Sequence, residues 1–317
     1  MMDIRKLVIP INIRSLKTAN IYIISNGSKS LLVDSGMTPS TIEFLRSNNV
    51  DVDSISEVLL THLHFDHIGG AARLQADLGV PVNIGTKDAE IINRMIIDPK
   101  GYLRNEIGYL KYIGFPETQL ELAEKTNPVM ETYQMAAGIE KLTPVDEGVS
   151  FNGFPEISLL SVPGHTPGSM TYVIKKLNTA FTGDHVIEKI TPNISYYDDD
   201  SDMLGFYMKS LISLRETGIE FGYSGHGADI YNLGYRIDDI LGHHKLRLSE
   251  IYAQCNEWRT PYEISALIRW NRGRTIEDMS VMERIFALGE TLAHLRHLEK
   301  IGLISKSENN GRIRYKI

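Results

Sequence analysis

Short apolar runs separated by turn residues dominate the first part of the chain. Six runs have the length and the β-branched or aromatic content of strands: residues 20–25, 30–34, 58–61, 156–162, 170–174 and 179–182. Asn-Gly pairs at positions 26–27 and 152–153 mark tight turns beside these runs. A helix is expected to begin at Thr38-Pro39, because proline fits the first helical position. The pattern alone predicts a mixed α and β fold.

Residues 86–145 have a different pattern, largely helical and rich in Ile, Met, Leu and Tyr. Proline and glycine interrupt it near residues 100, 115 and 128. One interpretation is a helical insertion that only extends the core. We favour a second interpretation, a lid that covers a site and lines an apolar substrate pocket. The candidates for that lining are Met95, Tyr109, Tyr112 and Tyr133.

The last part of the chain is expected to form three helices and a hairpin. A long helix is expected over residues 236–255, and Thr260-Pro261-Tyr262-Glu263 supplies a capping box that opens a second helix. A third helix over residues 280–300 carries apolar residues at helical spacing. The hairpin consists of a strand at 303–306, a turn at 308–311 and an alternating strand at 312–317. This is the order of elements in a winged-helix domain.

Charge is unevenly distributed along the 317 residues. Residues 240–317 hold 13 Lys and Arg against 9 Asp and Glu, a net charge of +4, whereas residues 1–239 hold 20 against 31, a net charge of −11. This asymmetry supports a catalytic domain over 1–239 and a second domain over 240–317. The overall charge of −7 argues against a protein that binds nucleic acid in general.

Cysteine content and hydropathy indicate the cellular environment. The single cysteine, Cys255, excludes an internal disulfide framework and is consistent with a reducing compartment. Residues 1–14 contain no apolar run long enough for a signal peptide, and no segment approaches the length of a membrane span. We therefore expect a cytoplasmic protein with no membrane partner.

One short segment carries the strongest chemical signal. The sequence His62-Leu63-His64-Phe65-Asp66-His67 directly follows an apolar run at residues 58–60. Burying three imidazoles and a carboxylate together is unfavourable without a cation, because desolvation and mutual repulsion have nothing to offset them. The segment therefore predicts a metal site.

Three further side chains of the same kind follow, each next to a glycine at the end of an expected strand. They are His165 in Pro-Gly-His-Thr-Pro-Gly, Asp184 in Thr-Gly-Asp, and His226 in Ser-Gly-His-Gly. With the first segment they complete an imidazole and carboxylate set that suits one or two metal ions. His185 is not counted as a ligand, because it would point away from its neighbour in an extended chain. Asp34 either orients the ligand loop or merely ends its strand, and the sequence leaves both interpretations open.

The order H-x-H-x-D-H, Gly-His, Gly-Asp and Gly-His resembles the metallo-β-lactamase-fold hydrolases over residues 7–229. The resemblance implies an α+β fold, an αββα sandwich with metals at the strand ends. It also implies that His62, His64 and His165 hold one metal, that Asp66, His67 and His226 hold another, and that Asp184 bridges them. The C-terminal part resembles the winged-helix domain appended to some of these hydrolases, among them lactamase-beta-like endoribonucleases and several thioesterases.

Individual residues separate the chain from some relatives. Flavodiiron oxygen reductases usually carry a carboxylate where His64 stands, and zinc β-lactamases lack the bridging Asp and commonly use a cysteine ligand. Glyoxalase II-like and lactonase-like enzymes keep all seven positions, as this chain does.

The resemblance therefore implies a dinuclear hydrolase in which a metal-bound hydroxide attacks a small thioester, ester or lactone. We expect two divalent transition-metal ions, with Zn²⁺ first and iron or manganese as alternatives that accept the same donors. Asp66 is the expected catalytic group, which steadies the leaving group or its proton.

Two other functions stay open. A metal-dependent endoribonuclease acting on single-stranded RNA would use the basic face formed by Arg312, Arg314 and Lys316. A non-catalytic winged-helix regulator is the second alternative, although an intact ligand set speaks against it. We favour the small-molecule hydrolase, without a nucleic-acid partner, and we expect a homodimer that the C-terminal domain helps to stabilise.

Overall fold

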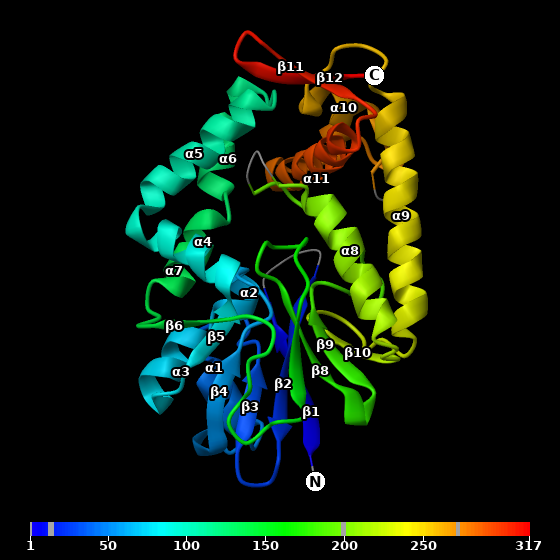
Figure 1. The fold of residues 1–317 in the computed structure, drawn as a ribbon. Helices are drawn as coiled ribbons and strands as arrows, with labels where there is room; N and C mark the ends of the chain where they lie inside the picture. The colour runs from blue at the N-terminus through cyan, green and yellow to red at the C-terminus, as the bar shows by residue number, and fades with distance from the viewer. Residues whose placement is uncertain (1, 12–15, 198–200, 271–272) are drawn as a thin grey trace.

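The computed structural model describes residues 2–11, 16–197, 201–270 and 273–317 of the chain. Two β-sheets lie face to face with helices on both outer sides, and a unit of helices and a hairpin lies beyond one end of the strands (Figure 1). This is the αββα sandwich that the resemblance implies, followed by a smaller C-terminal unit.

The first sheet has six strands in the order β1-β2-β3-β4-β5-β6. Their bounds are Asp3–Pro10, Thr18–Ser25, Ser30–Val33, Ile55–Leu59, Val82–Gly85 and Leu142–Val145. The first three strands are antiparallel, and β3 to β6 run parallel. Because β3 and β4 are parallel, their ends meet at one edge, where the backbone N–H of Asp34 donates to the carbonyl of Leu59 at 2.9 Å.

The second sheet has four strands in the order β10-β9-β8-β7. Their bounds are Ile157–Ser161 for β7, Met170–Ile174 for β8, Thr179–Gly183 for β9 and Phe221–Ser224 for β10. The parallel pair of β9 and β10 brings Asp184 and His226 to the same edge. The backbone N–H of Asn20 donates to the carbonyl of Gly225 at 2.7 Å, which joins this edge to the first sheet.

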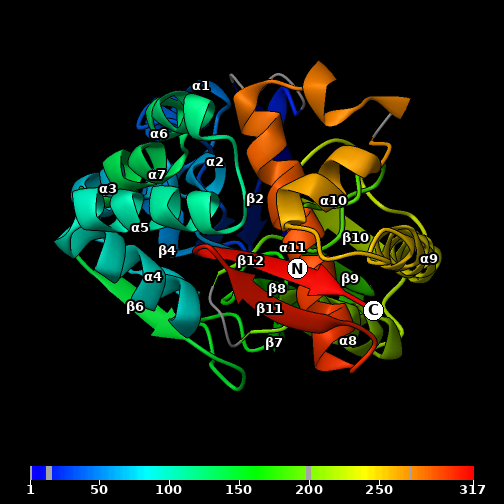
Figure 2. The same cartoon turned by 90° about the horizontal axis from the view of Figure 1, so that it is seen from above.

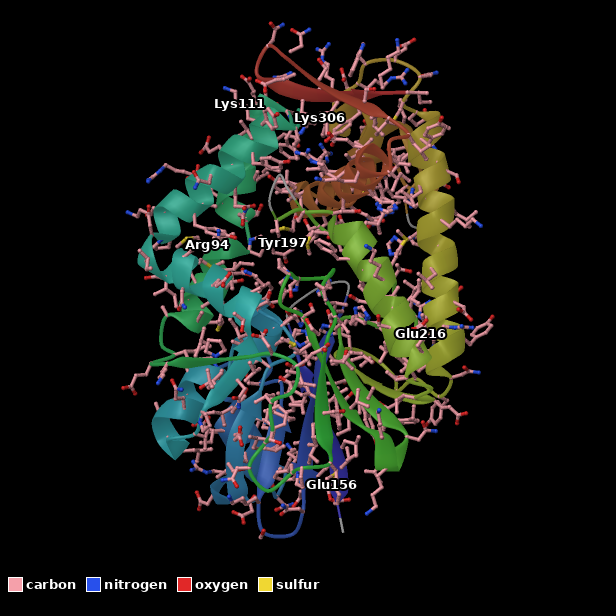
Figure 3. The ribbon with its side chains drawn as sticks, in the orientation of Figure 1. Arg94, Lys111, Glu156, Tyr197, Glu216 and Lys306 are labelled. Atoms are coloured by element: carbon pink, nitrogen blue, oxygen red, sulfur yellow. The ribbon has the colours of Figure 1, made fainter. Side chains whose placement is uncertain are left out.

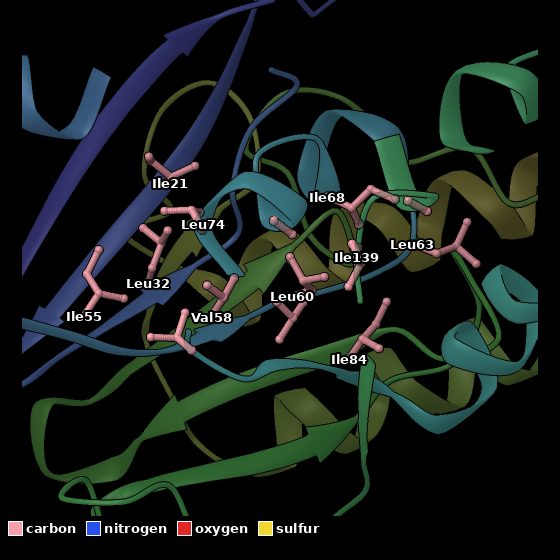
Figure 4. Packing of buried hydrophobic residues seen from close by; sticks show 14 of the residues in the cluster. Ile21, Leu32, Ile55, Val58, Leu60, Leu63, Ile68, Leu74, Ile84 and Ile139 are labelled. Carbon is pink, nitrogen blue, oxygen red and sulfur yellow. The ribbon is translucent and has the colours of Figure 1, made fainter. Parts of the chain in front are cut away.

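Alternation along β2 shows how the layers are held together. Tyr22 and Ile24 point into the cluster between the two sheets, whereas Ile21 points into the cluster beneath the helices. Figure 4 shows the cluster beneath the helices. It contains Leu60, which precedes the ligand segment, and Leu63, which lies within it. The helices on this side are α1 (Thr41–Ser47), α2 (Phe65–Ile68) and α3 (Ala71–Leu78).

The insertion between β5 and β6 is helical, as its pattern predicts. It contains α4 (Thr86–Ile97), α5 (Pro99–Tyr112), α6 (Leu120–Thr126) and α7 (Val129–Ala136). Within the described residues, short 3₁₀ turns lie at Val52–Ser54, Glu117–Gln119, Lys175–Leu177 and Ile276–Asp278.

The outer face of the second sheet is covered by α8 (Met203–Glu216) and α9 (Leu233–Ala253). The helix α9 is continuous through residue 240. Its Ile237 lies in a hydrophobic cluster with Val173 and Leu211, the cluster of the second sheet, and its Ile251 lies in a cluster with Ile264 and Tyr315, the C-terminal cluster. Helix α10 (Pro261–Leu267), helix α11 (Val281–Lys300) and the hairpin of β11 (Ser305–Asn309) and β12 (Arg312–Lys316) follow in the predicted order (Figure 2). Among the described residues, no helix is both long enough and apolar enough to cross a membrane.

Several element boundaries differ from the prediction; the strand expected at 58–61, for example, is β4 at Ile55–Leu59. Helix α1 begins at Thr41 after Ser40, so Pro39 precedes the helix and does not open it. Helix α9 begins earlier than expected, because the side chain of Asn232 accepts from the N–H of Tyr235 and caps it. The strand predicted at 303–306 lies at Ser305–Asn309, because Asn310 and Gly311 both adopt positive φ and form a tight turn of two residues.

Candidate metal centre

The ligand segment lies where β4 ends and the short helix α2 begins. His64 is the N-cap of α2, so His62 and His64 stand before the helix while Asp66 and His67 stand on its first turn. The reversal of the chain at this point directs all four side chains to one place. The polar groups are crowded there and largely removed from solvent, since His62, Asp66 and His67 are buried.

The first cluster consists of His62, His64 and His165. Nδ1 of His64 lies 3.0 Å from Nε2 of His62 and 3.0 Å from Nε2 of His165. With metal–nitrogen bonds of about 2.0–2.1 Å, two donors of a tetrahedral site lie roughly 3.3 Å apart. The three nitrogens therefore fit around one ion with only small adjustment.

The second cluster consists of Asp66, His67 and His226. Nε2 of His226 lies 3.3 Å from Nε2 of His67 and 3.4 Å from Oδ2 of Asp66. These separations again match the edges of a tetrahedral site. Each cluster could hold a metal ion.

Asp184 lies between the two clusters. Its Oδ1 is 3.5 Å from Nε2 of His67, and its Oδ2 is 3.3 Å from Nε2 of His226 and 3.9 Å from Nε2 of His165. Within the part of the chain that the structure describes, Oδ1 is buried and has no hydrogen-bond partner. A buried carboxylate oxygen without a partner is costly, and a cation at this position would satisfy it. The structure thus brings all seven predicted donors together.

Electrostatics differ between the two clusters. Burial holds the pKa of His62 well below its usual range and lowers that of His64 to about 3, and burial also lowers the pKa of His165. These imidazoles are therefore neutral, the form in which histidine binds metal. Burial also opposes protonation of His67 and His226, but the charges of nearby carboxylates outweigh it and raise their pKa values to about 9 and about 11. Without a cation, the second cluster therefore keeps protons that a metal ion would displace.

The ring nitrogens that face away from the clusters are also hydrogen-bonded. Nδ1 of His67 lies 2.8 Å from Oδ2 of Asp34, and Nδ1 of His226 lies 2.6 Å from the carbonyl of Thr18. Nδ1 of His62 lies 3.0 Å from Oγ1 of Thr61. Such bonds fix the tautomer and the orientation of a metal-binding imidazole. Of the two interpretations of Asp34, the structure supports the first, because its carboxylate orients His67.

Sequence reasoning missed Asp88, which joins the two ligand loops. Its Oδ2 accepts from the N–H of Leu63 at 2.9 Å and from Oγ1 of Thr166 at 2.7 Å, and its Oδ1 accepts from the N–H of Gly168 at 2.7 Å. Burial raises its pKa to about 7. Asp88 stands at the start of α4, inside the segment read as an insertion, and no motif around it signals this role.

The four lid candidates pack against two hydrophobic clusters. Met95 is buried in the cluster beneath the helices, and Tyr133 packs against the same cluster. Tyr109 and Tyr112 pack against the C-terminal cluster. Helical spacing accounts for the contact of these side chains with the two cores. Whether the insertion acts as a lid remains a prediction.

Comparison with known proteins agrees with this geometry. Residues 15–226 match the model of the Metallo-beta-lactamase superfamily, and residues 248–317 match that of the Metallo-beta-lactamase-like, C-terminal domain. The Lactamase-like protein nscB of Aspergillus fumigatus is 26% identical over 243 residues, which cover 74% of this chain and 56% of that protein. The Atrochrysone carboxyl ACP thioesterase of the same species is 25% identical over 238 residues, which cover 74% of this chain and 59% of that protein. The chain thus spans little more than half the length of these relatives.

Among solved structures, the metallo-beta-lactamase family protein TTHA1429 from Thermus thermophilus is similar over nearly the whole chain. The TM-score is 0.82 at 24% sequence identity, and the alignment covers 99% of this chain and 98% of that one. This likeness shows that the sandwich and the C-terminal unit occur together in another protein. From the family models and the fold, we conclude that this chain belongs to the metallo-β-lactamase superfamily.

Proposed function

We propose that this superfamily hydrolase binds two divalent metal ions, Zn²⁺ in the first place, and hydrolyses small thioesters, with esters and lactones as related substrates. The observation that carries the proposal is the position of Asp184, whose two oxygens face His67 in one cluster and His165 in the other. A carboxylate placed in this way can bridge two ions.

Each part of the chain has a defined task in such a site. Divalent ions in the two clusters would polarise the scissile carbonyl and lower the pKa of a bound water toward about 7. The neutral imidazoles of the first cluster offer lone pairs without the need to lose a proton. Asp184 would hold the two clusters at a fixed separation, which positions the water and the substrate for attack.

Asp66 is the group that we expect to handle the proton. Burial alone would raise its pKa, but His67 and His226 lower it, so the carboxylate stays ionised. Its Oδ2 faces His226 at 3.4 Å, at the border of the second cluster. An ionised carboxylate there can accept the proton of the attacking water and return it to the leaving group.

The thioester preference is supported by the relative whose name describes an acyl-carrier-protein thioesterase. Thioesters also suit the site chemically, because a thiolate leaves without much assistance from a general acid. RNA binding by the basic face of Arg312, Arg314 and Lys316 has less support. The guanidinium of Arg312 lies 3.3 Å from the carboxylate of Glu117, which partly neutralises its charge.

The decisive experiment compares turnover of a thioester, a lactone, a phosphotriester and single-stranded RNA by metal-analysed protein. We expect about two ions per chain and the highest kcat/KM for the thioester. Asp184→Asn should abolish this turnover and lower the metal content, whereas Asp238→Asn should change neither, because Asp238 pairs with Arg215 at the surface. Turnover of RNA alone would replace the proposal with an endoribonuclease. Metal-loaded protein that turns over none of the four would indicate a non-catalytic role.

A further inference from the structure

Residues 193–197, between Asp184 and α8, contact two ligands of the first cluster. The carbonyl of Asn193 lies 2.9 Å from Nδ1 of His165, the ring nitrogen that faces away from the cluster. The hydroxyl of Tyr197 lies 3.5 Å from Nε2 of His64 and donates to the carbonyl of His165 at 3.4 Å. Since His64 faces the cluster through Nδ1, Tyr197 stands at its outer nitrogen. One short segment therefore contacts the outer side of two ligands.

The same segment is held from the opposite side by the C-terminal helix α11. The side-chain N–H of Asn193 donates to the carbonyl of Phe286 at 3.1 Å and to Oε2 of Glu290 at 3.3 Å. Ser195 lies directly against Gly289, where an added Cβ would come within 2.6 Å of the serine Oγ. The absence of a side chain at Gly289 is what lets the segment approach α11 so closely.

The insertion provides a third point of contact. The ring of Tyr196 stacks on the ring of Tyr109 in α5, with centroids 4.0 Å apart and planes 4° from parallel. Tyr197 packs against the cluster beneath the helices and against the cluster of the second sheet, and Tyr196 packs against the C-terminal cluster. Figure 3 shows Tyr197 in this position, between the insertion and α8 and beneath α11.

We propose that the C-terminal domain and the insertion set the geometry of the first metal cluster through residues 193–197, with Asn193 and Tyr197 as positioning residues for His165 and His64. The proposal rests on the metal centre proposed above. Hydrogen bonds to the outer nitrogen of a metal-binding imidazole control its orientation and basicity. A shift of α11 relative to the sandwich would therefore alter metal affinity without touching a ligand.

The test separates this link from simple packing. Asn193→Ala removes the side chain that reaches α11 but keeps the backbone carbonyl that faces His165. Tyr197→Phe removes the hydroxyl but keeps the ring. Gly289→Leu places a side chain of α11 against Ser195. The matched control is Gly242→Leu, because Gly242 lies on α9 and has nothing within 4 Å of an added Cβ.

The measurements are the dissociation constant for Co²⁺, by competition with a chelator, and the visible spectrum of the Co²⁺-loaded protein, which reports ligand geometry. We expect Asn193→Ala, Tyr197→Phe and Gly289→Leu each to raise the dissociation constant of one of the two ions by about 10-fold to 100-fold and to shift the spectrum. Gly242→Leu should match the wild type in both measurements. If Gly289→Leu does not fold, the other two variants still decide the question.

The outcomes are distinct. Suppose that the wild type binds Co²⁺ and that Asn193→Ala and Tyr197→Phe bind it with the same affinity and spectrum. This result would overturn the inference and leave the metal centre intact. Wild-type protein that binds no Co²⁺ would overturn the metal centre and this inference with it.

Discussion

Oδ2 of Asp34 lies 2.8 Å from Nδ1 of His67, and both side chains are buried. The other oxygen, Oδ1, accepts from the backbone N–H of Thr61 at 2.7 Å. Asp34 has a φ of 56°, a left-handed conformation that Asp and Asn adopt more readily than most residues. One residue at the end of β3 thus orients the imidazole of His67, a candidate metal donor, and also holds the start of the ligand segment.

Asp34→Asn tests the charge at this position with little change of shape or backbone preference. We expect the second cluster to lose about 10-fold to 100-fold in metal affinity, because the amide orients His67 without the negative charge that raises its basicity. Chelator competition and metal analysis measure the effect. Equal affinity in the variant and the wild type would show that the hydrogen bond acts through geometry alone.

Asp88→Ala should destabilise the protein more than most single changes. The replacement leaves the buried N–H groups of Leu63 and Gly168 without their acceptor, at a cost of about 1–3 kcal/mol for each group. Because these groups lie in the two ligand loops, metal content should fall as well. Denaturant unfolding and metal analysis of the same preparation measure both effects.

A matched control for Asp88 lies on the same insertion. Asp98 caps α5 by accepting from the N–H of Gly101 at 2.8 Å, in an exposed position. Asp98→Ala should cost about 1 kcal/mol and leave the metal content unchanged. If Asp98→Ala and Asp88→Ala behave alike, Asp88 has no specific role in joining the loops.

Asp202 provides a test by pH. It caps α8 through the N–H of Gly205 at 2.9 Å and lies 2.9 Å from Nδ1 of His297 on α11. Burial alone would raise its pKa, but His297 and the N–H of Gly205 outweigh burial and lower it. A lowered carboxyl pKa contributes stability above the unfolded value of about 3.9, and this stability is lost as the pH falls through the folded value.

Asp202→Asn keeps a good capping residue but removes the charge. We expect the wild type to have the higher free energy of unfolding near pH 6, with an advantage that shrinks as the pH falls below about 4. Asp202→Ala should lose about 1 kcal/mol more, since it also removes the cap. Thermal unfolding across this pH range measures the difference, and an advantage that grows toward acid would contradict the assignment.

The convergence of the seven candidate donors could be predicted from the sequence because each belongs to a short motif at the end of a strand. A parallel arrangement of β3 with β4, and of β9 with β10, then brings those ends together. The capping box at Thr260 and Glu263 was also predicted and is confirmed, because it involves residues only three positions apart. Both predictions therefore depend on short sequence motifs.

Residues that act through distant backbone atoms could not be predicted. Asp88 accepts from the N–H of Gly168, 80 positions away, and Asn193 donates to the carbonyl of Phe286, 93 positions away. Nothing in their neighbouring residues distinguishes them from ordinary surface polar side chains. The lid candidates show the same limit, since helical spacing marks Met95 and Tyr109 for burial but does not say which core each of them joins.

The last prediction concerns the basic face of β12. Along this strand Ile313 and Tyr315 are buried in the C-terminal cluster, while Arg312, Arg314 and Lys316 lie on the opposite face, as alternation requires. We propose that this face contributes to a homodimer and does not serve RNA. Replacing all three with Gln should weaken self-association in sedimentation experiments and leave thioester turnover unchanged, because the strand contributes no metal donor.

The control replaces Lys100, Lys141 and Lys175, three exposed lysines elsewhere, with Gln. It makes the same change in net charge, so it should leave self-association as in the wild type. If the face bound single-stranded RNA instead, a plot of the logarithm of the binding constant against the logarithm of the salt concentration would have a slope of roughly −0.7 per phosphate contact. The triple change in β12 would then flatten the slope by about two units. Salt-dependent RNA cleavage lost only in the β12 variant would favour the endoribonuclease over the small-molecule hydrolase.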